Sequence, residues 1–138
     1  MNRRRLLLAI AAFQLRADDA QDVWELFTAL ASALSEGNAV RFMKAFDRSM
    51  KDYAVLEASI AALLQQAQVQ SSIEVLNDAG DGPSRSVELD WFLQIVDQQD
   101  SAASTRRRER VRCRLAKQGK TWQITALEPL AFFAPLRP

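Results

Sequence analysis

A chain of 138 residues that is 49% apolar and 25% charged is long enough for one domain with a core and has the composition of a soluble globular protein. Its formal net charge of +1 lacks the basic excess with which proteins hold DNA or RNA, so we expect no nucleic-acid partner. With no histidine and one cysteine, Cys113, the sequence has no cluster of metal ligands and no intramolecular disulfide, and we expect no metal or other cofactor.

The N-terminal segment has the layout of a secretory signal peptide. Three arginines, Arg3–Arg5, precede an apolar run over residues 6–13, and Ala17 stands before the first acidic side chains. The run is too short to cross a bilayer, so we expect no stable membrane insertion. We predict a signal peptide over residues 1–17, whose loss lowers the formal charge of +1 by four, to −3, a periplasmic or secreted location, and a single domain over residues 18–138. The alternative is an amphipathic first helix that packs on the domain.

Apolar residues recur at helical spacing in three segments of the first half of the chain. The first predicted helix runs from Asp18 to Glu36 and is ended by Gly37. The second is short and starts after Asn38, whose side chain can cap it, and the third follows the turn "DRSMKDY". The apolar positions on the three helices are Val23, Phe27, Leu30 and Leu34; Ala39, Phe42, Met43 and Phe46; and Leu56, Ile60, Leu63, Leu64 and Ala67.

After Gln68 the apolar period changes from 3.6 residues to two, which is the period of a β-strand. We predict strands in "SSIEVL", in residues 85–97, in the arginine-rich segment 104–115, and in a last segment that ends near Glu128. After this segment, we expect "LAFFAP" to pack as an apolar tail. Five arginines of the third strand share one face and so form a side of a strand and not a nucleic-acid patch, namely Arg106, Arg108, Arg110, Arg112 and Arg114. The apolar face of the two central strands consists of Val87, Leu89, Trp91, Leu93, Ile95, Val111, Cys113 and Leu115.

The alternation restricts how the strands pair. Pairing Trp91 with Val111 sets apolar residues opposite one another, and the register in which paired numbers sum to 200 rather than 202 is the near alternative. A shift by one residue would set every apolar side chain opposite an arginine. For the next hairpin we predict a two-residue turn at Gln118–Gly119, with Leu115 opposite Trp122.

These elements predict an α+β domain in which three N-terminal helices pack on a curved antiparallel sheet of about four strands. Over residues 18–134, the order of elements, the run "SEGNAVRFMKAFD" and the last hairpin "GKTWQI" resemble the nuclear transport factor 2-like superfamily, a cone-shaped cystatin-like fold shared with ketosteroid isomerase and polyketide cyclases. The resemblance implies a pocket between the inner sheet face and the helices. Members include both enzymes and binding modules, so the fold leaves the function open.

Catalytic members of that superfamily combine a pocket carboxylate or histidine base with a tyrosine or an acid that stabilises an oxyanion. This chain has no histidine and one tyrosine, so its candidates are Asp47, Tyr53 and Glu109. Asp47 matches the end of the helix motif, but an aspartate at a helix end more often starts a turn or caps the next segment. Alternation puts Glu109 on the apolar face, where it is either a pocket acid or a rim residue that pairs with Arg107.

The aromatic side chains can line an apolar cavity for a small ligand, although most of them are needed for the core. Tyr53 stands out because its hydroxyl requires a partner if it is buried. The candidate ligand-pocket residues are Trp24, Phe27, Phe42, Phe46, Tyr53, Trp91 and Glu109, with Trp122 as a further aromatic of the same kind.

The charged face of the sheet has three interpretations, which are exposed cross-strand ion pairs, a homodimer surface, or an anion site. Each exposed pair contributes on the order of 0 to 1 kcal/mol, so the pairs mainly keep the face soluble and its register unique. Arginine is favoured at interfaces, and we predict a homodimer through this face. The face consists of Glu88, Asp90, Phe92, Arg108, Arg110, Arg112 and Arg114.

We therefore predict an exported domain that binds a small apolar ligand or a protein partner without recognisable catalytic machinery. The alternative is an enzyme of the isomerase, dehydratase or cyclase kind that uses a pocket carboxylate and a tyrosine.

Overall fold

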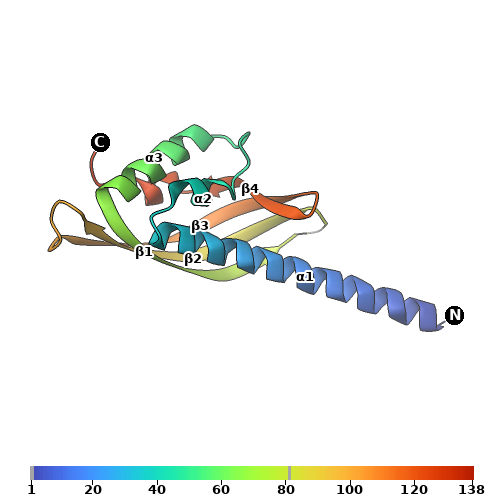
Figure 1. The fold of residues 1–138 in the computed structure, drawn as a ribbon. Helices are drawn as coiled ribbons and strands as arrows, with labels where there is room; N and C mark the ends of the chain where they lie inside the picture. Colours follow the sequence, from blue (N-terminus) through green and yellow to red (C-terminus); the bar gives the residue numbers. More distant parts are fainter. Residues whose placement is uncertain (1, 81) are drawn as a thin grey trace.

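The chain forms three helices, then a four-stranded antiparallel sheet, then a short 3-10 helix, which confirms the predicted α+β layout. The computed structural model describes residues 2–80 and 82–138, with side chains from residue 19 onward. The helices lie on one side of the curved sheet, and the N-terminal half of α1 projects beyond it (Figure 1). The elements are α1 (Asn2–Ser35), α2 (Ala39–Met43), α3 (Tyr53–Gln66), β1 (Ala67–Ala79), β2 (Ser84–Asp97), β3 (Ser104–Gln118), β4 (Thr121–Glu128) and η1 (Leu130–Phe133).

Helix α1 begins earlier than predicted, at Asn2 rather than Asp18. The predicted signal peptide falls in the part of α1 whose side chains lie outside the described residues, so it stays a prediction. Within the described residues, no helix combines the length and the apolar character that a membrane crossing requires. The apolar stripe of α1 packs chiefly against β1 and consists of the buried residues Val23, Phe27, Leu30, Ala33 and Leu34.

The corner between α1 and α2 is built by the two residues that the sequence indicated. Gly37 adopts a φ of +71°, a left-handed conformation that glycine tolerates, and the Asn38 amide donates to the Ala33 carbonyl over 2.8 Å. The Asn38 side chain then accepts a 2.9 Å hydrogen bond from the Arg41 amide and caps α2. Helix α3 buries Leu56, Ile60 and Leu63 against the same core.

The strands lie in the order β1-β2-β3-β4, and the alternation of faces is as predicted. On β2 and β3 the apolar face is buried beneath the helices, whereas the five arginines at even positions of β3, Arg106 to Arg114, point away from them and are exposed. The two-residue period therefore assigned both faces of the central strands correctly.

The hairpin of β2 and β3 adopts the register that the sequence left as the near alternative, and the pairing of β3 with β4 is shifted by two residues next to its turn. Across β2 and β3, Trp91 pairs with Glu109 and not with Val111, so the paired numbers sum to 200. Asp100 sets this register, because its carboxylate and carbonyl accept hydrogen bonds from the Ala102 and Ala103 amides and centre the turn there.

The tight turn between β3 and β4 lies at Gly119–Lys120, with Gln118 opposite Thr121, one residue later than predicted. Gly119 has a φ of +65°, which suits a glycine in the first central position of a two-residue loop. Leu115 consequently pairs with Ile124 and not with Trp122.

Aromatic rings fill the interior between the sheet and the helices. Trp91 is fully buried, and its ring centroid lies 5.0 Å from that of Phe133, 6.0 Å from that of Phe132 and 6.4 Å from that of Phe42. Phe132 and Phe133 come from η1, so the C-terminal segment packs as the predicted apolar tail. Arg107 holds this segment by donating to the carbonyls of Phe132, over 2.9 Å, and Ala134, over 2.6 Å.

Candidate functional site

A groove of about 680 Å³ lies between α2, the start of α3 and β4. It brings together three residues that the sequence singled out, namely Phe46, Asp47 and Tyr53. Met43 and Phe46 are buried beneath it, and Tyr53 is half-buried at its side. The other lining residues are Ala39, Val40, Lys44, Arg48, Glu57, Ala61 and Gln123.

The segment after α2 is fixed against β4 by backbone hydrogen bonds. The Ile124 amide donates to the Ala45 carbonyl over 2.8 Å, and the Asp47 amide donates to the Ile124 carbonyl over 2.9 Å. This short parallel bridge at Phe46 attaches the helical layer to the last strand. It therefore gives the groove a rigid edge made from two distant parts of the sequence.

The Asp47 carboxylate is held by three hydrogen bonds. One oxygen accepts from the Ser49 amide over 2.9 Å and from the Ser49 hydroxyl over 2.8 Å, and the other accepts from the Gln118 amide group over 2.8 Å. The bonds from the Ser49 backbone, the Ser49 side chain and then Gln118 hold the pKa of Asp47 below its usual range. Asp47 is thus an ionised turn former and a weak base.

Apolar and charged groups are both present around the groove. Val40 is 71% exposed on its rim, although valine is usually buried. Lys44 and Arg48 oppose Asp47 and Glu57 in sign, so the rim has no net formal charge. The Tyr53 hydroxyl makes no hydrogen bond to any residue that the structure describes. This arrangement suits a mostly apolar molecule with a few polar groups.

The remaining candidate aromatics lie elsewhere. Phe27, Phe42 and Trp91 belong to the packed core, and the Trp91 indole donates to the Ser71 hydroxyl over 2.8 Å. Trp24 is 54% exposed on α1 and lies outside the core. The predicted pocket between the inner sheet face and the helices is therefore filled at Trp91 by the protein's own side chains, because the C-terminal segment packs there.

Trp122 is buried between two cations. The Arg85 guanidinium lies 5.9 Å and the Lys117 ammonium 5.8 Å from its ring centroid, and the two cations pair with Asp78 and Asp19 over 2.7 and 3.1 Å. The contact from Lys117 to Asp19 attaches α1 to the far end of β3.

Glu109 is exposed, although alternation places it on the same side of β3 as Val111. It lies opposite Trp91 in the register but lines shallow hollows at the rim, away from the groove. Arg107, its expected partner, instead donates to the carbonyls of Phe132 and Ala134. The structure thus separates Glu109 from the other two catalytic candidates.

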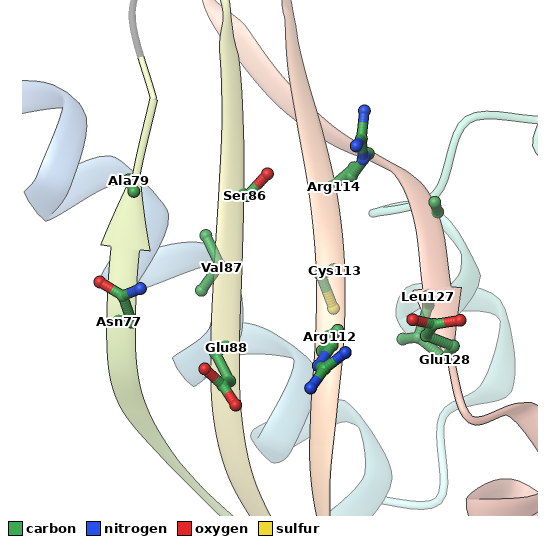
Figure 2. A pocket seen from close by; sticks show the side chains of 11 residues that line it. Asn77, Ala79, Ser86, Val87, Glu88, Arg112, Cys113, Arg114, Leu127 and Glu128 are labelled. Carbon is green, nitrogen blue, oxygen red and sulfur yellow. The ribbon is translucent and has the colours of Figure 1, made fainter.

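The face of the sheet that points away from the helices, hereafter the outer face, has a hollow of about 430 Å³. Figure 2 shows Asn77, Glu88, Arg112 and Glu128 side by side on the four strands, with α1 behind the sheet. At the next positions along β2 and β3, on the side of the row away from Ser86 and Arg114, Arg108 pairs with Asp90 over 2.6 Å and Arg110 with Glu88 over 3.3 Å. Hydrogen bonds from Arg108 hold the pKa of Asp90 below its usual range.

Sequence reasoning missed most of the groove, including Met43, Glu57, Ala61 and Gln123. The one available signal was Val40, an apolar residue next to the helix cap and outside the predicted stripe of the second helix. Among the residues that the structure describes, no three Cys, Asp or Glu side chains converge as a metal site would require.

Comparison with solved structures shows the fold. The chain is similar to a scytalone dehydratase-like protein of Novosphingobium aromaticivorans (TM-score 0.75, 5% identity, 83% of this chain and 85% of the other). It is also similar to a nuclear transport factor 2-like protein with a cystatin-like fold from the same organism (TM-score 0.68, 11% identity, 86% and 84%). A Mycobacterium tuberculosis protein of unknown function gives a TM-score of 0.72 at 11% identity (83% and 72%). Neither a protein-family model nor a curated protein matches the sequence.

The chain therefore has the nuclear transport factor 2-like fold that its sequence resembles. At these levels of identity the likeness concerns the fold, and proteins with this fold include ones named for an enzyme and ones of unknown function. The function must be argued from this chain's own surfaces.

Proposed function

We propose that this protein is an exported domain that binds a small, mostly apolar molecule in the groove between α2 and α3, without an acid–base pair that would transform it. The observation that carries the proposal is the groove itself, because it joins a buried apolar floor, Met43 and Phe46, to a tyrosine and a balanced charged rim. Its volume of about 680 Å³ is that of a site for a small molecule.

The groove is favoured over the interior because the two differ in free space. Binding beside Trp91 would require the rings of Phe132 and Phe133 to leave, and both are buried. Binding in the groove requires no such rearrangement. A ligand there would cover Val40 and the half-buried ring of Tyr53, whose hydroxyl can orient a polar group of the ligand.

The second candidate function is an enzyme that uses Asp47 and Tyr53. It is supported by the presence of both residues in one groove. It is weakened by the lowered pKa of Asp47, since a carboxylate that is already satisfied by Ser49 and Gln118 is a poor general base near neutral pH. A substrate whose turnover is lost in both Asp47→Asn and Tyr53→Phe, while its binding is retained, would favour this alternative.

Two phenylalanine substitutions at alanine positions of α3 test the binding proposal. Ala61→Phe places a ring in the groove, whereas Ala58→Phe adds the same ring at an exposed position of the same helix. Binding of anilinonaphthalene sulfonate, measured by fluorescence, and small molecules that co-purify, identified by mass spectrometry after denaturation, should be lost in the first variant and kept in the second. Val40→Asp should also weaken binding, and its exposed position protects the fold. Equal binding by all three variants would contradict the proposal.

Export is a separate part of the proposal. It is supported by the arginines and apolar run of residues 1–17, and removal of that segment leaves the contact from Asp19 to Lys117 and the buried Val23 in place. Expression of the full chain in a Gram-negative host, followed by fractionation and intact-mass measurement, should give a periplasmic protein that starts at Asp18. A cytoplasmic protein that retains residues 1–17 would contradict export.

A further inference from the structure

The rim of the groove between α2 and α3 has an apolar end and a polar end. The two helices run in opposite directions, and residues 44–52 connect them at one end of the groove (Figure 1). The rim residues far from this connection are all apolar, namely Ala39, Val40 and Ala61. The rim residues at the connection are charged or carry a hydroxyl, namely Lys44, Asp47, Arg48 and Tyr53. A molecule that matches both ends of the groove is amphipathic.

Hydrogen-bond donors outnumber acceptors at the polar end. The side chains of Lys44 and Arg48 are exposed and carry only donors, and neither makes an ion pair with a residue that the structure describes. Asp47 lies between them in the sequence, but its carboxylate already accepts three hydrogen bonds, from Ser49 and Gln118. The donors of both cations are therefore available to a ligand group that accepts hydrogen bonds.

A cationic ligand fits the groove less well than an anionic one. The acidic lining residues are Asp47 and Glu57. Neutral donors occupy both oxygens of Asp47, so only Glu57, exposed on α3, could pair with a cation without loss of a hydrogen bond. Two cations stand against this one carboxylate, so the rim favours a ligand that carries negative charge.

We propose that the ligand of this groove is a monocarboxylate with an apolar chain. This inference rests on the proposed function, since it names the chemical class of the molecule that the groove binds. The carboxylate accepts hydrogen bonds from Lys44 and Arg48, and the Tyr53 hydroxyl donates to it. The apolar chain lies over the buried Met43 and extends towards Val40.

The length of the groove sets the length of the apolar chain. From Tyr53 to Ala61, α3 advances by eight residues, or about 12 Å of helix. An extended medium-chain carboxylate such as decanoate matches this length. Burial of the chain supplies most of the affinity, whereas the exposed cations contribute less and select the head group.

Three probes that share one chain and differ in their head groups test the inference, namely decanoate, decanol and decylammonium. Isothermal titration calorimetry at neutral pH should show that decanoate binds the wild-type protein more tightly than decylammonium. The double variant Lys44→Gln, Arg48→Gln should weaken decanoate binding by roughly tenfold, because each exposed ion pair is worth up to about fivefold in the dissociation constant, and should leave decanol binding within about twofold. Lys51→Gln removes an exposed cation of the same connection that lies outside the groove, and it should leave all three affinities unchanged.

Charge reversal separates a lost contact from a damaged fold. In the double variant Lys44→Glu, Arg48→Glu, decylammonium should bind more tightly than decanoate, and misfolding cannot produce such an inversion. Both side chains are exposed, and thermal unfolding checks that the variant is folded. An inverted preference supports the inference, and a folded variant that still prefers decanoate overturns it.

The phenylalanine variants of α3 distinguish failure of this inference from failure of the proposed function. If Ala61→Phe abolishes binding while Ala58→Phe does not, the groove is the binding site. Equal affinity of the wild-type protein for decanoate and decylammonium, or decanoate binding that the Lys44→Gln, Arg48→Gln variant retains, would then overturn the carboxylate alone. If no probe binds the wild-type protein, or if Ala61→Phe leaves binding intact, the proposed function fails and the inference fails with it.

Discussion

Phe133→Ala removes a ring of the C-terminal segment that fills the space between the sheet and the helices. Phe133 is fully buried, and its ring centroid lies 5.0 Å from those of Trp91 and Phe132 and 5.9 Å from that of Phe42. Burying such a side chain stabilises a protein by about 1.5–3 kcal/mol. The cavity that remains after its removal raises the expected loss in free energy of unfolding to about 3–5 kcal/mol.

Trp24→Ala is the matched control because it removes a still larger aromatic side chain that is 54% exposed. We expect its loss to be about 1 kcal/mol or less. Urea unfolding followed by far-ultraviolet circular dichroism measures both variants, and the Phe133→Ala midpoint should fall with an unchanged slope. Indole should raise the midpoint of Phe133→Ala by more than it raises that of the wild type, because an apolar cavity of this kind stays dry and binds small aromatic molecules. Equal losses for the two variants would refute the filled interior.

Three further predictions concern single side chains. Gln66→Ala removes the side chain that accepts from the Leu136 and Arg137 amides and donates to the Arg137 carbonyl, so we expect a loss of about 1–3 kcal/mol and faster hydrogen exchange confined to the C-terminal segment. The pKa of Asp47 is lower in the folded protein than the value of about 3.9 for an unfolded aspartate, so the ionised carboxylate stabilises the fold at pH values above 3.9. This stabilisation is lost as the pH falls through the lower folded pKa. Asp47→Asn should therefore flatten the decline in the urea midpoint below about pH 4. Burial raises the pKa of the Cys113 thiol to about 12, so maleimide at pH 8 should label it in urea and not in the native protein, and rapid native labelling would contradict its burial.

The faces of the sheet could be predicted from sequence because alternation is insensitive to an even shift. The two even-sum registers place the same residues beneath the helices, so the exposure of Arg108 and the burial of Leu89 follow from either. The choice between the registers depended on the turns, through the hydrogen bonds to Asp100 and the left-handed backbone of Gly119, and apolar patterning carries no information about either.

The candidate site was less predictable because it depends on how distant segments pack. Asp47 and Tyr53 lie in the same groove only because the segment after α2 bonds to Ile124 of β4, almost eighty residues later. The filling of the interior depends likewise on Phe132 and Phe133. The sequence indicated that this segment is apolar, but it did not indicate which part of the fold the segment packs against. Neither arrangement produces a periodic pattern in the local sequence from which it could be predicted.

Nuclear magnetic resonance of the wild-type protein, with its co-purified ligand or with anilinonaphthalene sulfonate, tests the central claim most directly. The Met43 methyl group reports on the groove, and the Trp91 indole N–H, bonded to Ser71, reports on the interior. Titration should shift the Met43 methyl resonance in a saturable manner and leave the Trp91 indole resonance in place. A shift at Trp91 with an unmoved Met43 methyl would show that the ligand enters the interior and would contradict the groove as the binding site.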